Sequence, residues 1–449
     1  MVFQLQRPFL PTDGDLSGVF TAIEGEDELI LGVDRSDEKL IERHAVVTFR
    51  DNVIEGLPAR ASPVLRNVIL SKAVEAIAAA PPKDHAASQP AVVEIEAPST
   101  YVSDPTLSRQ ALYEHDDLIL DGSAHSTALE RIVRNASERV IIHSTFVTDA
   151  GAEAILPLLL QASAKGVLID VLWGQDDVGT ATNSSQAAAQ RMKARIADAG
   201  RSDLIRVHPF STNSHAKVVV ADNGKGRWYA LLGSCNWLAS NFKSFESSIR
   251  LRDPAVVGML IRKLAGLTRG RPGIWHELAV EMTVLGRRVE SGPRGRGRTV
   301  PMRLLFAPDH AKLTLEARDR AKNRIFVLSH RLGVAGRPVS LLPILAAVRA
   351  KNIEAIAYYG QTTGALSGVE GADLTREFAT QGVNVRPIHR PRLHAKVLGW
   401  DDDALAMTSL NWLSADPPDL AVYREIGVVI EAPRIADNFV RVFENARID

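Results

Sequence analysis

The sequence lacks the features that define several large classes of protein. Its single cysteine, Cys235, in 449 residues excludes a disulfide framework and a multi-cysteine metal site. The longest apolar stretch, residues 154–174, is interrupted by Gln161 and Lys165, so no segment predicts a membrane span. The N-terminal residues do not combine a basic segment with a following apolar one, so no secretory signal is predicted. We therefore expect a cytoplasmic protein without integral membrane association.

The net charge of zero conceals a difference between two regions of the chain. Residues 1–100 contain 16 acidic and 9 basic residues and carry a net charge of −7, whereas residues 101–449 carry +7. The basic excess of the larger region suits an anionic substrate without requiring one.

The beginning of the chain has the pattern of a separate small module. Short apolar, β-branched runs predict strands at residues 19–24, 28–33 and 44–49. Helical spacing over residues 63–80 ends at two prolines, so residues 1–80 predict a mostly β N-terminal module. Residues 81–114 predict a linker, being rich in Pro, Ala and Ser over most of their length. Residues 1–105 contain no chemical motif, and both an acidic domain that binds a protein partner and a stabilising appendage remain open.

The rest of the chain contains an internal repeat. The segment RVIIHS at 139–144 matches RIFVLS at 324–329, and further matched segments follow each of them in the same order. Each copy has the pattern strand, helix, strand, long loop, helix and strand pair. This order predicts two homologous α/β halves, residues 115–290 and 301–449, that form one pseudo-dimeric unit. The basic segment 291–300 between them is either a solvated linker or a contact for a phosphate backbone.

The repeat carries the residues with chemical potential. Each half contains the pattern H-x-K-x-x-x-x-D, formed by His215, Lys217 and Asp222 and by His394, Lys396 and Asp401. Each pattern is followed by S-x-N-W and then by a glutamate in an apolar context, which gives Ser234, Asn236 and Glu246 in the first half and Ser409, Asn411 and Glu425 in the second. One such pattern arises easily by chance, but two in the same place of a repeat do not.

The spacing has a physical interpretation. Histidine and lysine two residues apart on a strand project from the same face, so the two halves can bring two imidazoles and two ammonium groups together. Such a site neutralises the oxygens of a phosphodiester, while one imidazole attacks phosphorus and the other protonates the leaving oxygen. It contains no carboxylate cluster for a metal, so we predict neither a metal nor an organic cofactor.

These residues resemble the signature of the phospholipase D superfamily, over roughly residues 115–449. The resemblance implies a metal-independent, two-step reaction through a phosphohistidine, with His215 as the nucleophile and His394 as the acid. It further implies that Glu246 orients His215 and that Glu425 orients His394. The remaining members of the implied site hold phosphate (Lys217, Lys396, Asn236 and Asn411), support its binding (Ser234 and Ser409) or organise the site (Asp222 and Asp401).

Other residues near these motifs have more ordinary interpretations. His143 and His330 follow the opening strand of each half and are interpreted as buried, satisfied histidines, with lining of the site as the alternative. Trp237 and Trp412 are expected to pack beneath the site, with base stacking as the alternative. Cys235 is expected to pack into the core.

The superfamily includes proteins with different substrates, so three functions remain open. The favoured one is a nuclease, with nucleic acid as the partner and substrate. The second is a phospholipase D or phosphatidyl transferase that acts on phospholipids. The third is a non-catalytic binding scaffold, against which the two intact motifs argue.

Overall fold

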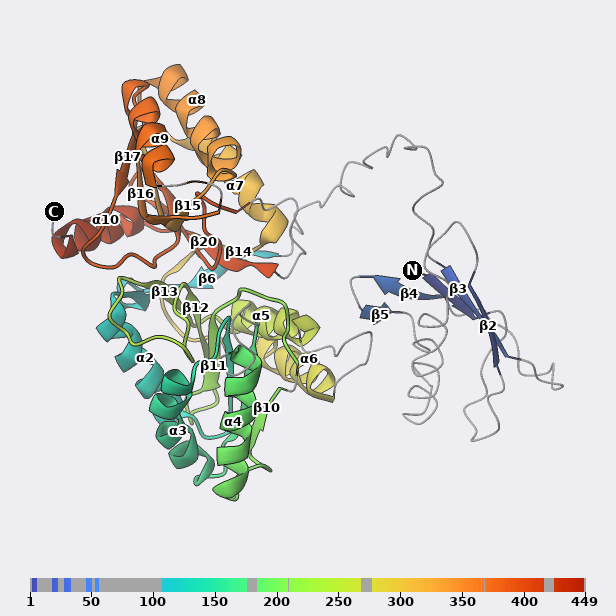
Figure 1. Ribbon diagram of the computed structural model, residues 1–449. Helices are drawn as coiled ribbons and strands as arrows, with labels where there is room; N and C mark the ends of the chain where they lie inside the picture. The colour runs from blue at the N-terminus through green and yellow to red at the C-terminus, as the bar shows by residue number, and fades with distance from the viewer. Residues whose placement is uncertain are drawn as a thin grey trace. The chain divides into compact units, whose positions relative to one another are not determined.

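The computed structural model describes residues 107–175, 184–208, 210–267, 277–364, 366, 368–415 and 424–447, and the backbone of five strands nearer the N-terminus (Figure 1). Contacts between residues divide the chain into two units. One unit consists of residues 1–100 and 268–281, and the other of residues 101–267 and 282–449.

The N-terminal unit contains a five-stranded sheet in the order β2-β3-β1-β4-β5. Its strands are β1 (Val2–Leu5), β2 (Gly18–Ala22), β3 (Glu28–Val33), β4 (Val46–Arg50) and β5 (Val53–Glu55). The three predicted strands are confirmed as β2, β3 and β4, to which β1 and β5 are added. The predicted helix at residues 63–80 lies outside the described residues.

The first half of the larger unit is built on a seven-stranded sheet in the order β10-β9-β8-β11-β12-β13-β7. Its strands are β7 (Leu118–Leu120), β8 (Arg139–Ser144), β9 (Leu168–Trp173), β10 (Ile205–Val207), β11 (Val218–Asp222), β12 (Trp228–Gly233) and β13 (Ser247–Leu251). Its helices are α2 (Gly122–Asn135), α3 (Asp149–Ser163), α4 (Ser185–Asp198) and α5 (Pro254–Leu267). Strands β8, β9 and β10 are parallel, and the pairs from β8 through β11, β12 and β13 to β7 are antiparallel.

The second half repeats this order in an eight-stranded sheet, β17-β16-β15-β18-β19-β20-β14-β6. Its strands are β6 (Ser108–Leu112), β14 (Thr299–Phe306), β15 (Arg324–Leu332), β16 (Glu354–Thr362), β17 (Asn384–Pro387), β18 (Val397–Trp400), β19 (Ala404–Thr408) and β20 (Ile426–Glu431). Its helices are α7 (Ala307–Arg320), α8 (Leu342–Lys351), α9 (Gly368–Thr380) and α10 (Ile435–Ala446). Strand β14 takes the place of β7, which confirms the two homologous α/β halves.

Strand β6 differs from the prediction for its segment. Residues 108–112 lie in the predicted linker, yet they pair antiparallel with β14 and form the edge of the second sheet. This segment buries Ala111 and Leu112, which stabilises a strand despite its polar first residues. Helix α6 (Glu277–Glu290) precedes the basic segment that leads into β14.

Each sheet has helices on both faces, because its strands alternate buried side chains between the two. In the first half α2, α3 and α4 share one apolar core with one face of the sheet, and in the second half α7, α8 and α9 do the same. On β15, Ile325 and Val327 belong to that core, whereas Phe326 stacks on Phe439 of α10 with ring centres 6.0 Å apart. Among the described residues, no helix is long and apolar enough to cross a membrane.

The two halves contact each other through their strand pairs. Strands β12 and β13 lie against β19 and β20, and Figure 1 shows the first half, from teal to yellow, beside the orange and red second half. The loops that end at the motif histidines lie at this junction.

Candidate active site

The two motif histidines lie in extended segments just before β11 and β18. The backbone N–H of His215 donates to the carbonyl of Arg424 in the second half at 2.6 Å, and that of His394 donates to the carbonyl of Phe245 in the first half at 3.0 Å. The motif spacing predicted each histidine on a strand of its own half. Instead, each is held at its backbone by the other half, so both reach the junction.

The side chains of these histidines also bond across the junction. Nδ1 of His215 lies 3.0 Å from Oε1 of Glu425, and Nδ1 of His394 lies 2.8 Å from Oε1 of Glu246. The expected pairing of each histidine with the glutamate of its own half is therefore wrong. Both glutamates immediately precede strands of the contact layer, β13 and β20, so they face the opposite half.

This pairing fixes the chemistry of the rings. A carboxylate beside Nδ1 accepts a hydrogen bond from the N–H of that nitrogen, so the free lone pair of the ring lies on Nε2. Both histidine side chains are 15% exposed, whereas Glu246 and Glu425 are buried. Each imidazole therefore has its second nitrogen available for a reacting group.

The motif serines support the glutamates. The hydroxyl of Ser234 donates to Glu246, and that of Ser409 donates to Glu425. Both serines are completely buried, and each hydroxyl also accepts a backbone N–H, at 2.9 and 3.0 Å. The two serines were predicted to support the binding of substrate. Instead, they lie behind the glutamates and hold them.

The two lysines are buried beside the histidines. Nζ of Lys217 donates to Thr145 Oγ1 and to the carbonyl of His215, both at 2.6 Å. Nζ of Lys396 donates to the carbonyl of His394 at 2.8 Å. Burial and the charge of Lys396 hold the pKa of Lys217 well below its usual value. Burial lowers the pKa of Lys396 to about 8, although both glutamates act in the opposite direction.

The charge states of the histidines and glutamates follow from burial and from their neighbours. Burial lowers the pKa of both His215 and His394 to about 4, against the effect of the facing carboxylates. Burial also opposes ionisation of Glu246 and Glu425, but the facing histidines outweigh it and lower the pKa of each glutamate to about 2. Both lysines act on both histidines. The four pairs of motif residues therefore form one site, with neutral imidazoles and charged carboxylates at neutral pH.

The asparagines and tryptophans repeat in the two halves. The amide oxygens of Asn236 and Asn411 are buried and have no hydrogen-bond partner among the residues that the structure describes. Each asparagine directly precedes a buried tryptophan, Trp237 or Trp412. The tryptophans are 1% exposed and belong to the two apolar cores, which confirms packing rather than stacking on a base. Cys235 is completely buried in the first core, as expected.

The motif aspartates lie outside the site, contrary to the prediction. Asp222 ends β11, five residues beyond Lys217 and about 17 Å along the strand. Its carboxylate accepts the backbone N–H groups of Glu138 at 2.9 Å and Arg139 at 3.0 Å. Asp401 likewise accepts the backbone N–H of Asn323, at 2.7 Å. Both aspartates therefore fix the chain where β8 and β15 begin, and the length of the strand separates them from the histidines.

The two additional histidine candidates differ from each other. His143 is completely buried, and its ring bonds to the carbonyl of Ala216 and to Thr212 Oγ1, both at 2.8 Å, so it is a satisfied core residue as predicted. His330 is only partly buried, and its ring centre lies 4.8 Å from that of His394, so the same interpretation is wrong for it. Burial and the charge of Lys396 lower the pKa of His330 to about 2.

A further pair of histidines supports the site from beneath and was not predicted. Nε2 of His125 lies 2.9 Å from Ser248 Oγ, and Nε2 of His310 lies 2.6 Å from Thr408 Oγ1. Their rings lie against the rings of the two core tryptophans, at 5.7 and 5.2 Å. The available signal was a histidine early in the first long helix of each half.

Among the described residues, no group of three or more His, Cys, Asp or Glu side chains could hold a metal ion. The arrangement can instead hold a phosphate between two lysines and two imidazoles.

These features define a two-lobed α/β protein with one site shared by its halves. The family model described as "Cardiolipin synthase, PLD-like domain" matches residues 129–267. This match covers most of the first half, and that part of the chain is similar to a phospholipase D-like domain.

Solved structures resemble this fold at low sequence identity. A phosphatidylserine synthase from Haemophilus influenzae Rd KW20 matches with a TM-score of 0.53 and 13% identity, over 75% of this chain and 87% of that one. A phospholipase D family member, Nuc, from Salmonella typhimurium has a TM-score of 0.27 and 20% identity, over 32% and 92%. A yeast tyrosyl-DNA phosphodiesterase has a TM-score of 0.44 and 10% identity, over 74% and 91%. No curated protein matches the sequence.

Proposed function

We propose that the protein is a nuclease that hydrolyses phosphodiester bonds through a phosphohistidine, without a metal ion. The observation that carries this proposal is the crossed pairing of His215 with Glu425 and of His394 with Glu246. The pairing leaves two Nε2 atoms and two lysines for one phosphate. Because both motifs are intact and joined in one site, this proposal is preferred to a non-catalytic scaffold.

The first step transfers the phosphoryl group to the protein. Nε2 of His215 attacks phosphorus, and the bond between phosphorus and the leaving oxygen breaks as His394 delivers a proton to that oxygen. The lysines stabilise the charge that develops on the non-bridging oxygens. Since the free histidines have pKa values of about 4, the acid form of His394 depends on the negative charge of the bound substrate, which raises its pKa.

The second step releases the product. His394, now neutral, accepts a proton from water as the water oxygen attacks phosphorus and the bond to His215 breaks. Both histidines return to their starting states, so the step needs no oxidant, reductant or other co-reactant. Glu246 and Glu425 hold the rings through Nδ1 throughout.

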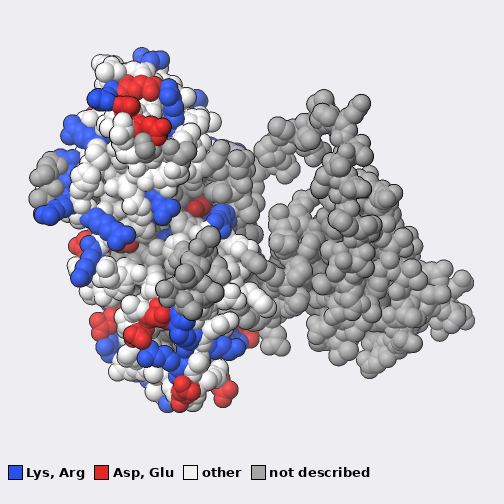
Figure 2. Space-filling view, in the orientation of Figure 1, with Lys and Arg blue, Asp and Glu red and all other residues white. Residues whose placement is uncertain are grey.

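A polyanionic substrate is favoured by the charges around the site. Arg331 and Arg392 are exposed and act on His330 beside His394. Figure 2 shows mostly Lys and Arg side chains across the middle of the visible face, with acidic side chains mainly toward its ends. Apart from Val280 and Val284 on α6, the exposed large apolar side chains of the described residues lie on separate elements. An enzyme that binds acyl chains benefits from a continuous apolar patch.

A phospholipid substrate is the second candidate. It is favoured by the family description, which names a cardiolipin synthase, and by the similarity to a phosphatidylserine synthase. The site chemistry is the same for both substrates, so only an assay separates them.

The test compares the full chain with His215→Ala and His394→Ala in EDTA. Each protein is incubated with labelled single- and double-stranded DNA and RNA, and in parallel with phosphatidylcholine vesicles. His115→Ala, which changes an exposed histidine outside the site, is the matched control. We expect cleavage of nucleic acid by the wild-type and control proteins and a loss of at least about 10²-fold in each site variant.

Three other results contradict the proposal. Headgroup release without nucleic-acid cleavage identifies the lipid enzyme. Cleavage that EDTA abolishes excludes the metal-independent mechanism. Absence of both activities in the folded protein favours a scaffold, or a requirement for a partner, which a pull-down with and without residues 1–105 examines.

A further inference from the structure

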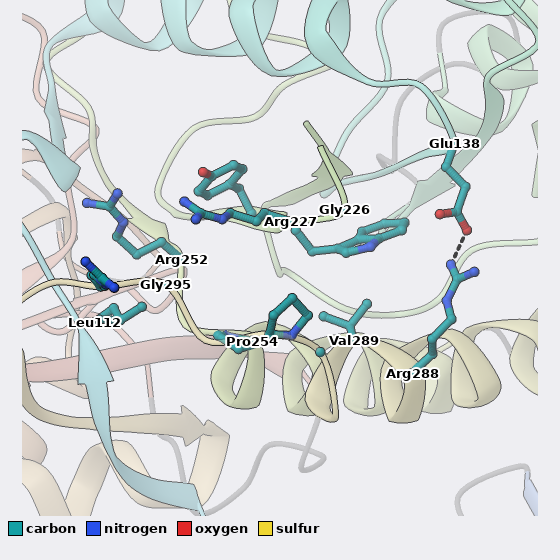
Figure 3. Close-up of a pocket in the computed structure, with 14 residues that line it drawn as sticks. Leu112, Glu138, Gly226, Arg227, Arg252, Pro254, Arg288, Val289 and Gly295 are labelled. Carbon is teal, nitrogen blue, oxygen red and sulfur yellow. Dashed lines mark hydrogen bonds and ion pairs between the residues drawn. The ribbon is translucent and has the colours of Figure 1, made fainter. Parts of the chain in front are cut away.

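A second polar pocket lies at the end of the first sheet that is remote from the catalytic histidines (Figure 3). It has a volume of about 260 Å³ and is lined by the start of β12, the turn before it, α6 and the basic segment that follows α6. Trp228 at its wall pairs with Asp222. Trp228 is about 20 Å along β12 from Ser234. The proposed catalytic reaction makes no use of the pocket.

The lining of the pocket is strongly cationic. Arg227, Arg252, Arg288 and Arg296 line it from four segments, with Glu138 as the acidic lining residue. Figure 3 shows the first three of these arginines around the pocket and the ion pair between Arg288 and Glu138. Arg252 bonds to Glu114 at 2.6 Å. Arg227 and Arg296 are exposed and have no acidic partner within the part of the chain that the structure describes.

The basic segment contributes to this wall, although most of its residues are exposed. Arg294 bonds to Asp253 at 2.8 Å and to the carbonyl of Gln110. A Cβ added to Gly295 would lie 3.8 Å from Nη1 of Arg227. The segment therefore passes directly beside the guanidinium of Arg227. The contacts of Arg294 help to hold the segment in this position.

The second half does not have these charges at the equivalent positions. Ten residues separate Asp222 from Gly233, against six between Asp401 and Thr408, and the longer turn supplies Arg227. The shorter turn carries Asp402 and Asp403 instead. Arg252 follows Glu246 by six residues, and Glu431 follows Glu425 by six. The positive pocket is thus specific to the first half, because the equivalent positions of the second half carry acidic residues.

The chemistry of the pocket fits a phosphate group. Guanidinium groups bind phosphate oxygens with paired, charge-assisted hydrogen bonds. The ring of Trp228 lies 5.9 Å from the guanidinium of Arg288 and adds a flat wall. The volume lies just below the range of about 300–1,000 Å³ that is usual for pockets that bind drug-sized ligands, which suits a ligand no larger than a nucleoside diphosphate.

We propose that this pocket binds a small phosphate-bearing ligand, of the size of pyrophosphate or a nucleoside diphosphate, at a site separate from the catalytic histidines. The inference does not depend on the proposed nuclease activity. Phosphates of a free small molecule and phosphates of a nucleic-acid strand share this chemistry, so the test includes both.

The test titrates pyrophosphate, ADP and a short single-stranded oligonucleotide into the full chain by calorimetry at 150 mM salt. The variants are Arg227→Glu and Arg296→Glu, both at exposed positions, and the matched control is Arg131→Glu, an exposed arginine on α2. We expect pyrophosphate or ADP to bind the wild-type protein and the control. We expect affinity to fall at least about tenfold in both pocket variants. His215→Ala should retain this binding.

Hydrolysis of bis(p-nitrophenyl) phosphate serves as an independent measurement, because the pocket variants should retain whatever rate the wild-type protein has. Failure of the nuclease proposal would leave the binding result intact. The inference is overturned if neither small ligand binds, if the pocket variants bind as well as the control, or if His215→Ala abolishes binding. Pocket-dependent binding of the oligonucleotide alone would also overturn it, since that result describes a nucleic-acid surface.

Discussion

The two halves of the larger unit are alike where they meet and unlike where they are far apart. At the junction each half contributes one His, Lys, Asn, Ser and Glu in matching positions, and the hydrogen bonds match as well. At the remote end of the sheet Arg252 faces a pocket, whereas its counterpart Glu431 pairs with Arg320. The shared site thus preserves the symmetry, and surfaces that only one half uses do not.

The junction itself contains one clear departure from symmetry. Thr145 bonds to Lys217, whereas the matching position, which lies in β15, holds His330, which contacts His394. The two motif histidines therefore have different neighbours. The following predictions examine how far the functional symmetry extends.

The largest expected effect separates the roles of the two histidines. His394→Ala should lose about 10²–10⁴-fold against nucleic acid, because the leaving oxygen is no longer protonated. With p-nitrophenyl esters, whose leaving group needs no acid, it should still release one equivalent of p-nitrophenol and retain labelled phosphate on the protein. His215→Ala should show no burst. Rapid-quench measurements provide the comparison, and a burst in His215→Ala alone would reverse the assignment.

The next largest effect tests the crossing of the pairs. Glu425→Gln should lower kcat/KM by about 10- to 100-fold, because the ring of His215 loses its charged acceptor. In a double-mutant cycle, His215→Ala should be strongly non-additive with Glu425→Gln and closer to additive with Glu246→Gln. Equal coupling to both glutamates would contradict separate crossed pairs.

The pH dependence of kcat/KM should be bell-shaped. Attack needs a neutral imidazole at His215, so activity should fall as the pH drops through about 4, the pKa of His215. Phosphate binding needs charged lysine, so activity should fall as the pH rises through about 8, the pKa of Lys396. Stopped assays at constant ionic strength give the profile, and a profile with one limb would count against the scheme.

The smallest effect on catalysis is expected at the motif aspartates. Asp222→Asn should lower the free energy of unfolding by about 1–3 kcal/mol, because backbone N–H groups lose a charged acceptor. Asp401→Asn should have a similar or smaller effect, and kcat should remain close to that of the wild type in both. Urea denaturation with parallel kinetics tests this, and a large loss of kcat in a stably folded variant would return the aspartates to the mechanism.

Site residues could be predicted from the sequence where a residue type at a given spacing is typical of one kind of chemistry. The repeated histidines, lysines and glutamates, and the two α/β halves that carry them, could be predicted in this way. The crossed pairs could not, because spacing along one strand does not say which half a side chain faces. The aspartates were placed at the site because the motif H-x-K-x-x-x-x-D suggests a single cluster, although four residues separate its lysine from its aspartate along an extended strand. His330 was interpreted as a buried histidine, with lining of the site as the alternative, because its neighbour His394 is distant in the sequence.

The crossed glutamates make the candidate site a property of the pair of halves rather than of either one. A first half expressed alone would present His215 without an acceptor and Glu246 without an imidazole, unless a second copy supplied both. One chain with two such halves assembles its site at a rate independent of protein concentration, and damage to either half silences both histidines together. The covalent connection between the halves thus replaces a dimer interface. The end of each sheet that is remote from the junction can change in sequence while the two halves stay together.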